Sequence, residues 1–455
     1  MNTTRQPLNP FRYGKPVPPD RFIGREDTQR TIFGRLNNGE STAIVGEPHI
    51  GKSSFLRYIR DERARNDWLG DEAAHFAFVD IDCHMLPSSF QPADFWEEVV
   101  GRVEETFANE ALRRPIEAVR RTTFDSFELK RLFETLGRNR KRAVVMVDEF
   151  DVLLHHENFN TAEFFGALRA LAIQTDGLAM LTASRMMVGE MNRRSQEINP
   201  LGSPFFNNLI EVRLLPLRPV EVERLIDQTL EVTGVTFSAE DRAYITRSSG
   251  RHPFLVQIAA AAVFESIAQH LDSNARYTQA DRTVQGWAAV HFEDVWQRLS
   301  PKLKQATLIL ALAEYSQVAK PPAAAITLSD DDHEMRWLAE GDLIETTTEQ
   351  HCASWRGDRW RICAGSFTRW LVESGRWMEP PKQEDMPTLD PTERGERISF
   401  LREKTSAQRR RFQVLELQRA QQGGTTDPKI ITEIEDLQRT IADDERELRR
   451  LGGRA

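Results

Sequence analysis

Short apolar runs alternate with amphipathic helical stretches from Arg21 to about Pro216. The runs have the length of strands and are Thr42–Gly46, Phe76–Ile81, Ala143–Asp148, Leu178–Ala183 and Leu209–Leu215. All but the last are almost continuously apolar, which is typical of strands buried on both faces of a parallel sheet. The segments between them, such as Gly51–Arg65 and Thr161–Ile173, have helical periodicity and complete β-α-β units. The pattern therefore predicts an α/β domain over residues 21–216.

The strand pattern then stops, and a purely helical pattern follows. Arg218–Val232 places its apolar residues on one helical face. Ser238 and Asp241 have the spacing of a capping box at the start of a second helix. Pro253 stands where a third helix begins, and proline is tolerated in a first turn. We expect a compact helical subdomain over residues 217–275.

Residues 276–378 show a third pattern, in which helices precede two strand-like pieces and a last helix. The expected helices are Phe292–Leu299, Lys302–Glu314, Asp331–Ala339 and Phe367–Gly375, and the expected strands are Asp342–Thr346 and Arg359–Ile362. Three helices followed by a two-stranded wing are the order of a winged-helix domain.

The composition changes after Met378. Residues 379–396 are rich in proline and acid, which predicts a linker. Beyond them, apolar residues recur at heptad-like spacing in two stretches separated by Gly423–Pro428, a segment with chain-reversing glycines and a helix-start signal. We expect residues 397–455 to form an antiparallel coiled-coil helical hairpin, whose apolar seam can also join a second copy or a partner helix.

Composition narrows the classes of protein that remain. The chain has 455 residues, 40% of them hydrophobic, which is enough for large cores and excludes a mostly disordered chain. Its net charge of −9 gives no general attraction for nucleic acid or anionic membranes. Three scattered cysteines exclude a disulfide framework. Residues 1–20 contain five prolines and no apolar secretory segment, so we expect a flexible N-terminal arm and a cytoplasmic protein without membrane spans.

A phosphate-binding motif follows the first predicted strand. Gly46-Glu47-Pro48-His49-Ile50-Gly51-Lys52-Ser53 fits G-x-x-x-x-G-K-[ST] at every fixed position, and Ser54 continues into the predicted helix. Backbone N–H groups and the helix N-terminus bind negative charge, Lys52 reaches the β- and γ-phosphates, and Ser53 binds Mg²⁺. A chance glycine-lysine turn is the alternative, but the strand before and the helix after the motif favour a P-loop.

Two adjacent acids end the third predicted strand. In a parallel sheet this places Asp148 and Glu149 at the carboxyl edge, where ligands bind. Acidic strand ends are common and usually inert, but a preceding P-loop favours a functional role. We expect Asp148 to belong to the Mg²⁺ shell and Glu149 to orient or deprotonate the attacking water.

The fourth strand ends in Ser184-Arg185 at the same edge. Arg185 is therefore a candidate contact for the γ-phosphate, and an exposed arginine at a helix start is the alternative. Thr182 in this strand is a weaker candidate for a polar contact to phosphate.

Two further segments resemble motifs of the STAND ATPases, an AAA+-related family of signal-transducing proteins. Phe22-Ile23-Gly24-Arg25-Glu26 resembles their "hhGRE" motif, and Gly250-Arg251-His252-Pro253-Phe254 resembles their "G-x-P" signature. The resemblance implies that the first segment lines an adenine pocket, that Pro253 packs against the base, and that Arg185 occupies the family's arginine position. It implies an ATPase core, a helical lid, a winged-helix domain, and a switch between a closed ADP state and an open ATP state.

Two functions from different classes remain, beside a third option, a nucleotide-binding scaffold with negligible turnover. The first is an ATP-binding and ATP-hydrolysing switch, slow and Mg²⁺-dependent, whose nucleotide state controls assembly or partner recruitment in bacterial stress or anti-phage signalling. The second is a DNA-associated AAA+ ATPase resembling origin-recognition or transposition-helper proteins. The expected recognition helix begins with acids in Ser329–Glu334, which would repel phosphate and favours the first function. We expect a protein partner or a second copy, bound through the winged helix or the hairpin, and no nucleic-acid partner.

Overall fold

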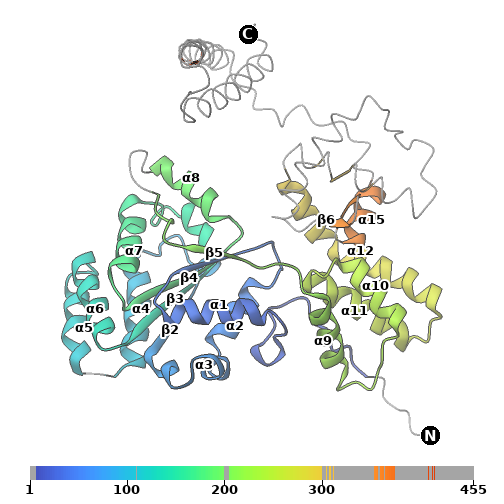
Figure 1. Cartoon of the computed structure of the whole chain (residues 1–455), viewed down its shortest axis with the longest axis horizontal. Helices are drawn as coiled ribbons and strands as arrows, with labels where there is room; N and C mark the ends of the chain where they lie inside the picture. Colours follow the sequence, from blue (N-terminus) through green and yellow to red (C-terminus); the bar gives the residue numbers. More distant parts are fainter. Residues whose placement is uncertain are drawn as a thin grey trace, which may run out of the picture. The chain divides into compact units, whose positions relative to one another are not determined.

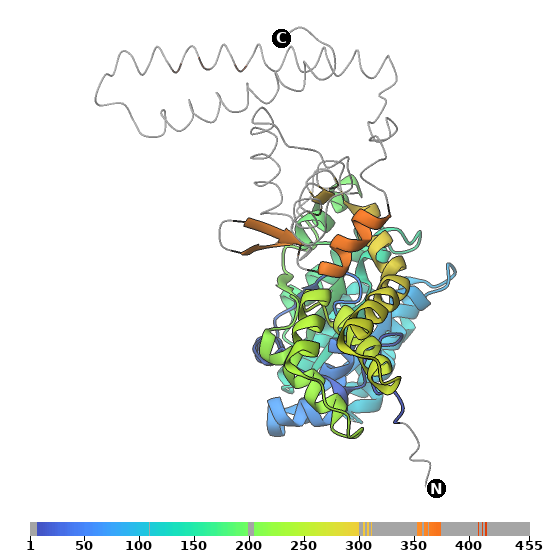
Figure 2. The same cartoon turned by 90° about the vertical axis from the view of Figure 1, so that its right-hand side faces the viewer.

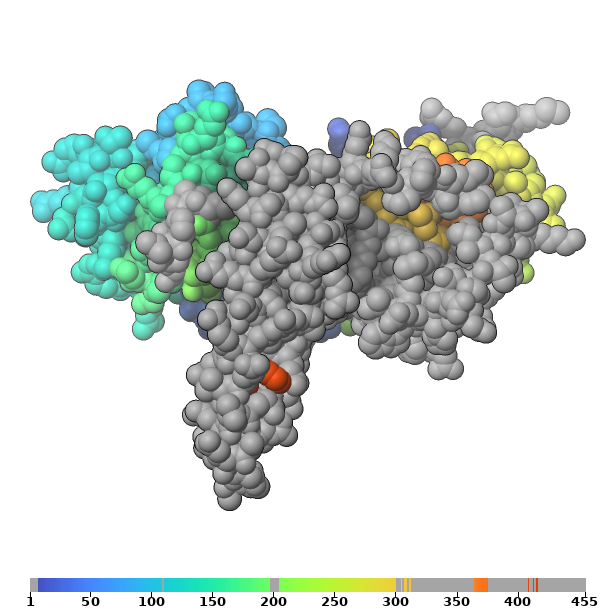
Figure 3. Space-filling view, turned by 90° about the horizontal axis from the view of Figure 1, so that it is seen from above, coloured from blue at the N-terminus to red at the C-terminus, as the bar shows by residue number. Residues whose placement is uncertain are grey.

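A computed structural model describes most of the chain up to residue 299 and several later segments (coloured in Figure 3). The described residues are 7–108, 110–198, 204–299, 304, 307, 308, 311, 353–356, 359–362, 364–374, 408, 412 and 415. Contacts divide the chain into two units, Met1–Met378 and Glu379–Ala455. The expected linker and almost all of the expected hairpin lie outside the described residues. The expected segments Asp331–Ala339 and Asp342–Thr346 lie outside them as well.

A five-stranded parallel sheet forms the centre of the first part of the chain (Figure 1). Its strands, in the spatial order β2-β3-β4-β1-β5, are β1 (Thr42–Val45), β2 (Phe76–Asp82), β3 (Arg142–Asp148), β4 (Leu178–Ser184) and β5 (Ile210–Arg213). The predicted strand positions are confirmed, with ends that differ by a few residues. Because every pairing is parallel, the carboxyl ends of β1, β3 and β4 lie at one edge.

Helices cover both faces of the sheet. They are α1 (Glu26–Asn37), α2 (Lys52–Arg60), α3 (Glu62–Leu69), α4 (Pro92–Thr106), α5 (Glu110–Arg121), α6 (Ser126–Arg138), α7 (Ala162–Gln174) and α8 (Val188–Ile198). Short 3₁₀ turns lie at Pro19–Arg21, Gly70–His75, Cys83–Met85 and Phe150–Leu154. Alternate residues of β3 face opposite cores: Val145 packs with the α4–α7 side, and Val144 packs with the α1–α2 side.

The prediction of a single helix over Gly51–Arg65 is wrong. The chain instead forms α2 and α3, because Asp61 is extended and its carboxylate accepts hydrogen bonds from the N–H groups of Arg63 and Ala64. A side chain that caps the next helix thus ends the continuous helical pattern.

Three lid helices follow the sheet, α9 (Pro219–Leu230), α10 (Ala239–Ser249) and α11 (Pro253–Ala268). The predicted capping box is present, since Ser238 and Asp241 exchange hydrogen bonds at the start of α10. Gly250 ends α10 with a φ of 58°, a left-handed conformation that favours glycine.

One long helix, α12 (Ser273–Arg298), replaces the short helix expected from Phe292. It packs beside α11, and Figure 2 shows it in gold next to the green lid helices. Beyond it, β6 (Ala353–Arg356) pairs antiparallel with β7 (Arg359–Ile362), and α15 (Gly365–Glu373) packs on α12. The lid, α12 and α15 share one hydrophobic core, so the boundary expected near residue 275 does not separate two cores. The winged helix stays a prediction.

The N-terminal arm is extended before Pro19 but is held to the lid. Phe11 is buried between the rings of Phe237 and Phe264, and Asn9 Nδ2 donates to the Ala261 carbonyl at 3.1 Å. The expectation of a flexible arm thus does not hold for these residues, because an apolar ring anchors them in the lid core. No helix within the described segments has both the length and the apolar character needed to cross a bilayer.

Candidate nucleotide site

The P-loop lies between β1 and α2, with its lysine at the centre. Lys52 is 5% exposed, and its ammonium donates to the carbonyls of Gly46 at 2.9 Å and Glu47 at 3.1 Å. Gly51 has a φ of 105°, and His49 has a φ of 61°, which only a minority of non-glycine residues adopt. Burial lowers the pKa of Lys52, and nearby Glu149 opposes that shift. The loop therefore wraps closely around a buried cation.

Arg25 connects the segment before α1 to this loop. Its guanidinium donates to the Ile50 carbonyl at 2.6 Å. The residue is 8% exposed, and burial lowers its pKa to about 10 against an opposing effect of Glu221. A buried arginine thus fixes the P-loop backbone from the side of the hhGRE-like segment.

Glu221, in the first turn of α9, holds that segment in place. Its carboxylate accepts from the backbone N–H groups of Arg25 and Arg218, both at 2.6 Å, and it is 2% exposed. Gly24 has a φ of 81°, and a Cβ there would lie 2.8 Å from the Glu221 side chain, so glycine is required. Burial alone would raise the pKa of Glu221. These hydrogen bonds and the charge of Arg218 lower it by more, so the net pKa lies below the ordinary value of a glutamate. The sequence analysis missed Glu221.

The predicted acids and arginine meet at the carboxyl edge of β3 and β4. Glu149 Oε2 lies 3.2 Å from Arg185 Nε, and the Glu149 N–H donates to Asp148 at 3.1 Å. Burial raises the pKa of Asp148, while a hydrogen bond with Ser53 lowers it. Thr182 is fully buried, and its hydroxyl has no hydrogen-bond partner among the described residues.

A cavity of about 650 Å³ opens beside the P-loop. The predicted site residues that line it are Phe22, Ile23, Arg25, Pro48, His49, Ile50, Gly51, Lys52, Ser53, Ser54, Glu149, Arg185 and Pro253. Gly24, Gly46, Glu47 and Asp148 do not line it: Gly24 faces Glu221, and Asp148 is hydrogen-bonded to Ser53. The structure thus brings together the P-loop, both strand ends and the lid proline around one space.

One part of the lining of this cavity is apolar. Ile23, Leu217, Leu225, Pro253 and Phe254 line it from the hhGRE-like segment and the lid. This chemistry suits a planar base, whereas the P-loop part of the lining, with Lys52, suits phosphates.

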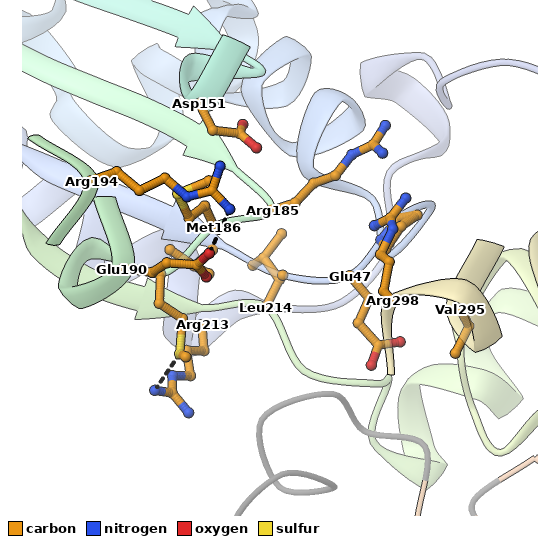
Figure 4. A pocket seen from close by; sticks show the side chains of 14 residues that line it. Glu47, Asp151, Arg185, Met186, Glu190, Arg194, Arg213, Leu214, Val295 and Arg298 are labelled. Atoms are coloured by element: carbon orange, nitrogen blue, oxygen red, sulfur yellow. Dashed lines mark hydrogen bonds and ion pairs between the residues drawn. The ribbon is translucent and has the colours of Figure 1, made fainter. Parts of the chain in front are cut away.

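A second cavity of about 500 Å³ lies next to Gly46–Pro48 (Figure 4). Four arginines line it, Arg185, Arg194, Arg213 and Arg298, together with Glu47, Asp151 and Glu190. Acids pair with Arg185, Arg194, Arg213 and Arg298, so its positive charge is largely balanced.

Aromatic and histidine rings connect the P-loop to the lid and α12. The His49 ring stacks on Phe254 at 4.7 Å and lies 5.6 Å from the His291 ring, which is 5.2 Å from the His252 ring. Burial lowers the pKa of all three histidines. The tip of the P-loop therefore rests on buried, neutral rings of two other elements.

Comparisons with known proteins agree with this geometry. The sequence model of the family described as "Novel STAND NTPase 1" matches residues 8–340. Among solved structures, the Walker-type ATPase of Pyrococcus abyssi is 15% identical with a TM-score of 0.51, and the match covers 80% of this chain and 99% of that one. The ORC2 protein of Aeropyrum pernix, solved in ADPNP–ADP complexes, is 12% identical with a TM-score of 0.45, covering 81% and 98%. A search of curated proteins finds no match. The chain has the fold of a P-loop ATPase.

Proposed function

Since this chain belongs to the novel STAND NTPase 1 family, we propose that it is an ATP-dependent molecular switch that binds and slowly hydrolyses ATP. The observation that carries the proposal is the buried Lys52, enclosed by its own loop at the sheet edge that also holds Asp148 and Glu149. A cavity lined by both a buried cation and apolar side chains matches a nucleoside triphosphate.

Mg²⁺ is the cofactor that fits the polar edge. Ser53 and Asp148 supply a hydroxyl and a carboxylate, the oxygen ligands that this ion prefers. Within the described segments, no group of three or more His, Cys, Asp or Glu residues could hold a metal by itself. The phosphates of the nucleotide would therefore supply the remaining ligands, and the ion would neutralise charge on them.

The protein's own groups have distinct tasks in this proposal. Lys52 exchanges its two loop carbonyls for phosphate oxygens, and backbone N–H groups of the loop bind the remaining charge. Glu149 orients the attacking water and accepts its proton. Arg185, now paired with Glu149, reaches the γ-phosphate when that group is present.

The biological output is part of the proposal. ATP binding would change the position of the lid and α12 and so control self-assembly or recruitment of a protein partner, in stress or anti-phage signalling. The histidine and Phe254 contacts support such coupling, because they join the P-loop to both elements. The DNA-associated alternative is less favoured because the acids in Ser329–Glu334 would repel phosphate.

Two substitutions in the full-length protein test the activity. Lys52→Ala should abolish ATP binding in calorimetry, whereas Arg57→Ala, an exposed change on the same helix, should leave it intact. Glu149→Gln should keep ATP binding and slow turnover by about 10²–10⁴-fold, the usual effect of losing a general base. The exposed change Glu157→Gln is its control. Wild-type binding by the Lys52 variant would refute the proposal.

A further inference from the structure

Some residues that line the cavity beside the P-loop belong to none of the recognised motifs. The N-terminal arm lines it with Arg12–Val17, and α12 lines it with Trp287 and Asp294. These segments lie outside the P-loop, the hhGRE-like segment and the lid signature.

The arm is fixed on both sides of its cavity-lining residues. At one end, the Val17 N–H donates to Ser54 Oγ in the first turn of α2 at 3.0 Å. At the other end, the Arg12 N–H donates to Gln257 Oε1 of α11 at 3.1 Å, and Phe11 is buried in the lid core. The arm therefore crosses from the phosphate-binding helix to the lid as an ordered strap.

An aromatic pair joins this strap to α12. The rings of Tyr13 and Trp287 are stacked, with centroids 5.0 Å apart and planes at 23°. Trp287 remains 44% exposed although it packs on a tyrosine, and both side chains line the cavity. A large aromatic face is thus left open at the border of the nucleotide space.

A purine base is a suitable partner for such a face. Stacking between a base and an aromatic side chain tolerates any base identity and contributes substantially to nucleotide affinity. The strap also supplies the cations Arg12 and Lys15 to the lining of the cavity. These residues carry the opposite charge to a nucleotide.

We propose that Tyr13 and Trp287, stacked on each other, form an aromatic platform whose exposed ring, Trp287, contacts the base of the bound nucleotide, so that the arm and α12 belong to the binding site. This inference rests on the proposed function. It goes beyond that function because it makes affinity depend on two elements outside the ATPase core.

A pair of ligands separates base contacts from phosphate contacts. ATP and inorganic tripolyphosphate are titrated by calorimetry into the full-length wild type and into Trp287→Ala, Trp287→Phe, Tyr13→Ala and Tyr13→Phe. Trp287→Ala should weaken ATP binding by roughly 10- to 100-fold, the loss expected for one base stack. Tyr13→Ala, which removes the ring behind Trp287, should weaken it by less, and both variants should leave tripolyphosphate binding unchanged. The phenylalanine variants, which keep a ring, should recover most of the ATP affinity.

Trp68→Ala is the matched control, because Trp68 also stacks on an aromatic ring, Phe33, but does not line the cavity. It should leave both affinities unchanged. Unchanged ATP affinity in the Trp287→Ala variant would overturn the proposal. Equal losses for ATP and tripolyphosphate would overturn it too, because the pair would then act on the P-loop. If the wild type bound neither ligand, the proposed function itself would fail.

Discussion

Mild acid should destabilise this protein through the histidine rings that join the P-loop to the lid and α12. His291 is 6% exposed and packs against His49 and His252, and its Nδ1 has no hydrogen-bond partner among the described residues. Burial lowers its pKa to about 4, His49 adds to that shift, Asp294 opposes it, and Arg298 lowers it slightly further. Protonation would therefore place a charge on a buried ring whose Nδ1 lacks a hydrogen-bond partner among the described residues.

The size of the effect follows from proton linkage. The pKa of His291 is about 4 when folded and 6.5 in its ordinary state, so between these values the unfolded chain binds more protons. Stability therefore rises with pH through this window and is lost as pH falls from about 6.5 towards 4. Between pH 7 and pH 5, His291 alone should cost about 2 kcal/mol of unfolding free energy. His49 and His252, whose pKa values are also lowered, act in the same direction.

Urea unfolding at pH 7 and pH 5 measures this difference. His291→Gln should lose about 2 kcal/mol less than the wild type between the two conditions, even if it is less stable at both. His84→Gln, at an exposed position, should keep the pH dependence of the wild type. The reasoning is refuted if the His291 variant and the wild type lose the same free energy on acidification.

Three further perturbations test other contacts. Glu221→Gln should destabilise the fold by about 2–4 kcal/mol in urea unfolding, because two backbone N–H donors, one of them buried, lose a charged acceptor. Glu223→Gln on the same helix breaks a partly exposed ion pair and should cost at most about 1 kcal/mol. Arg185→Ala should weaken ATP binding more than ADP binding in calorimetry, and equal losses would make it a structural residue. Deleting Ile398–Ala455, which belongs to the second unit, should leave ATP affinity unchanged but abolish nucleotide-dependent assembly as measured by mass.

The sheet was predictable because each buried strand is marked by its own apolar run in the sequence. Each strand buried on both faces is a nearly continuous apolar run, and a parallel sheet requires such runs. The P-loop was predictable for a similar reason, since its residues are consecutive and the sequence pattern clearly predicts the strand before it and the helix after it.

The first part of the long helix α12 escaped prediction because its buried face before His291 is made of small residues. Ala280, Val284 and Ala288 recur every four positions, but alanine contributes little apolar contrast against the polar residues between them. The helical break at Asp61 escaped for the opposite reason: the apolar periodicity continues through it, and only the capping side chain marks the end.

The contacts that complete the site are not local in sequence. Glu221 could be identified as a helix-start residue, but its contact with Arg25 spans 196 positions. The Tyr13–Trp287 stack likewise joins segments whose patterns carry no information about each other. Local patterns therefore identified the candidate site residues but not the residues that hold them in place.

The charged groups of the site bind one another in the structure described here, and this bears on how a switch would work. Lys52 is bound to its own loop, and Arg185 is paired with Glu149. A diphosphate would draw Lys52 away from its carbonyls but would offer Arg185 no new partner, so Glu149 would stay paired. A triphosphate would attract Arg185 to its third phosphate and release the Glu149 carboxylate to act on water. Since a ligand shifts an equilibrium only by its different affinities for two states, this exchange supplies the difference between ATP and ADP that the proposed switch requires.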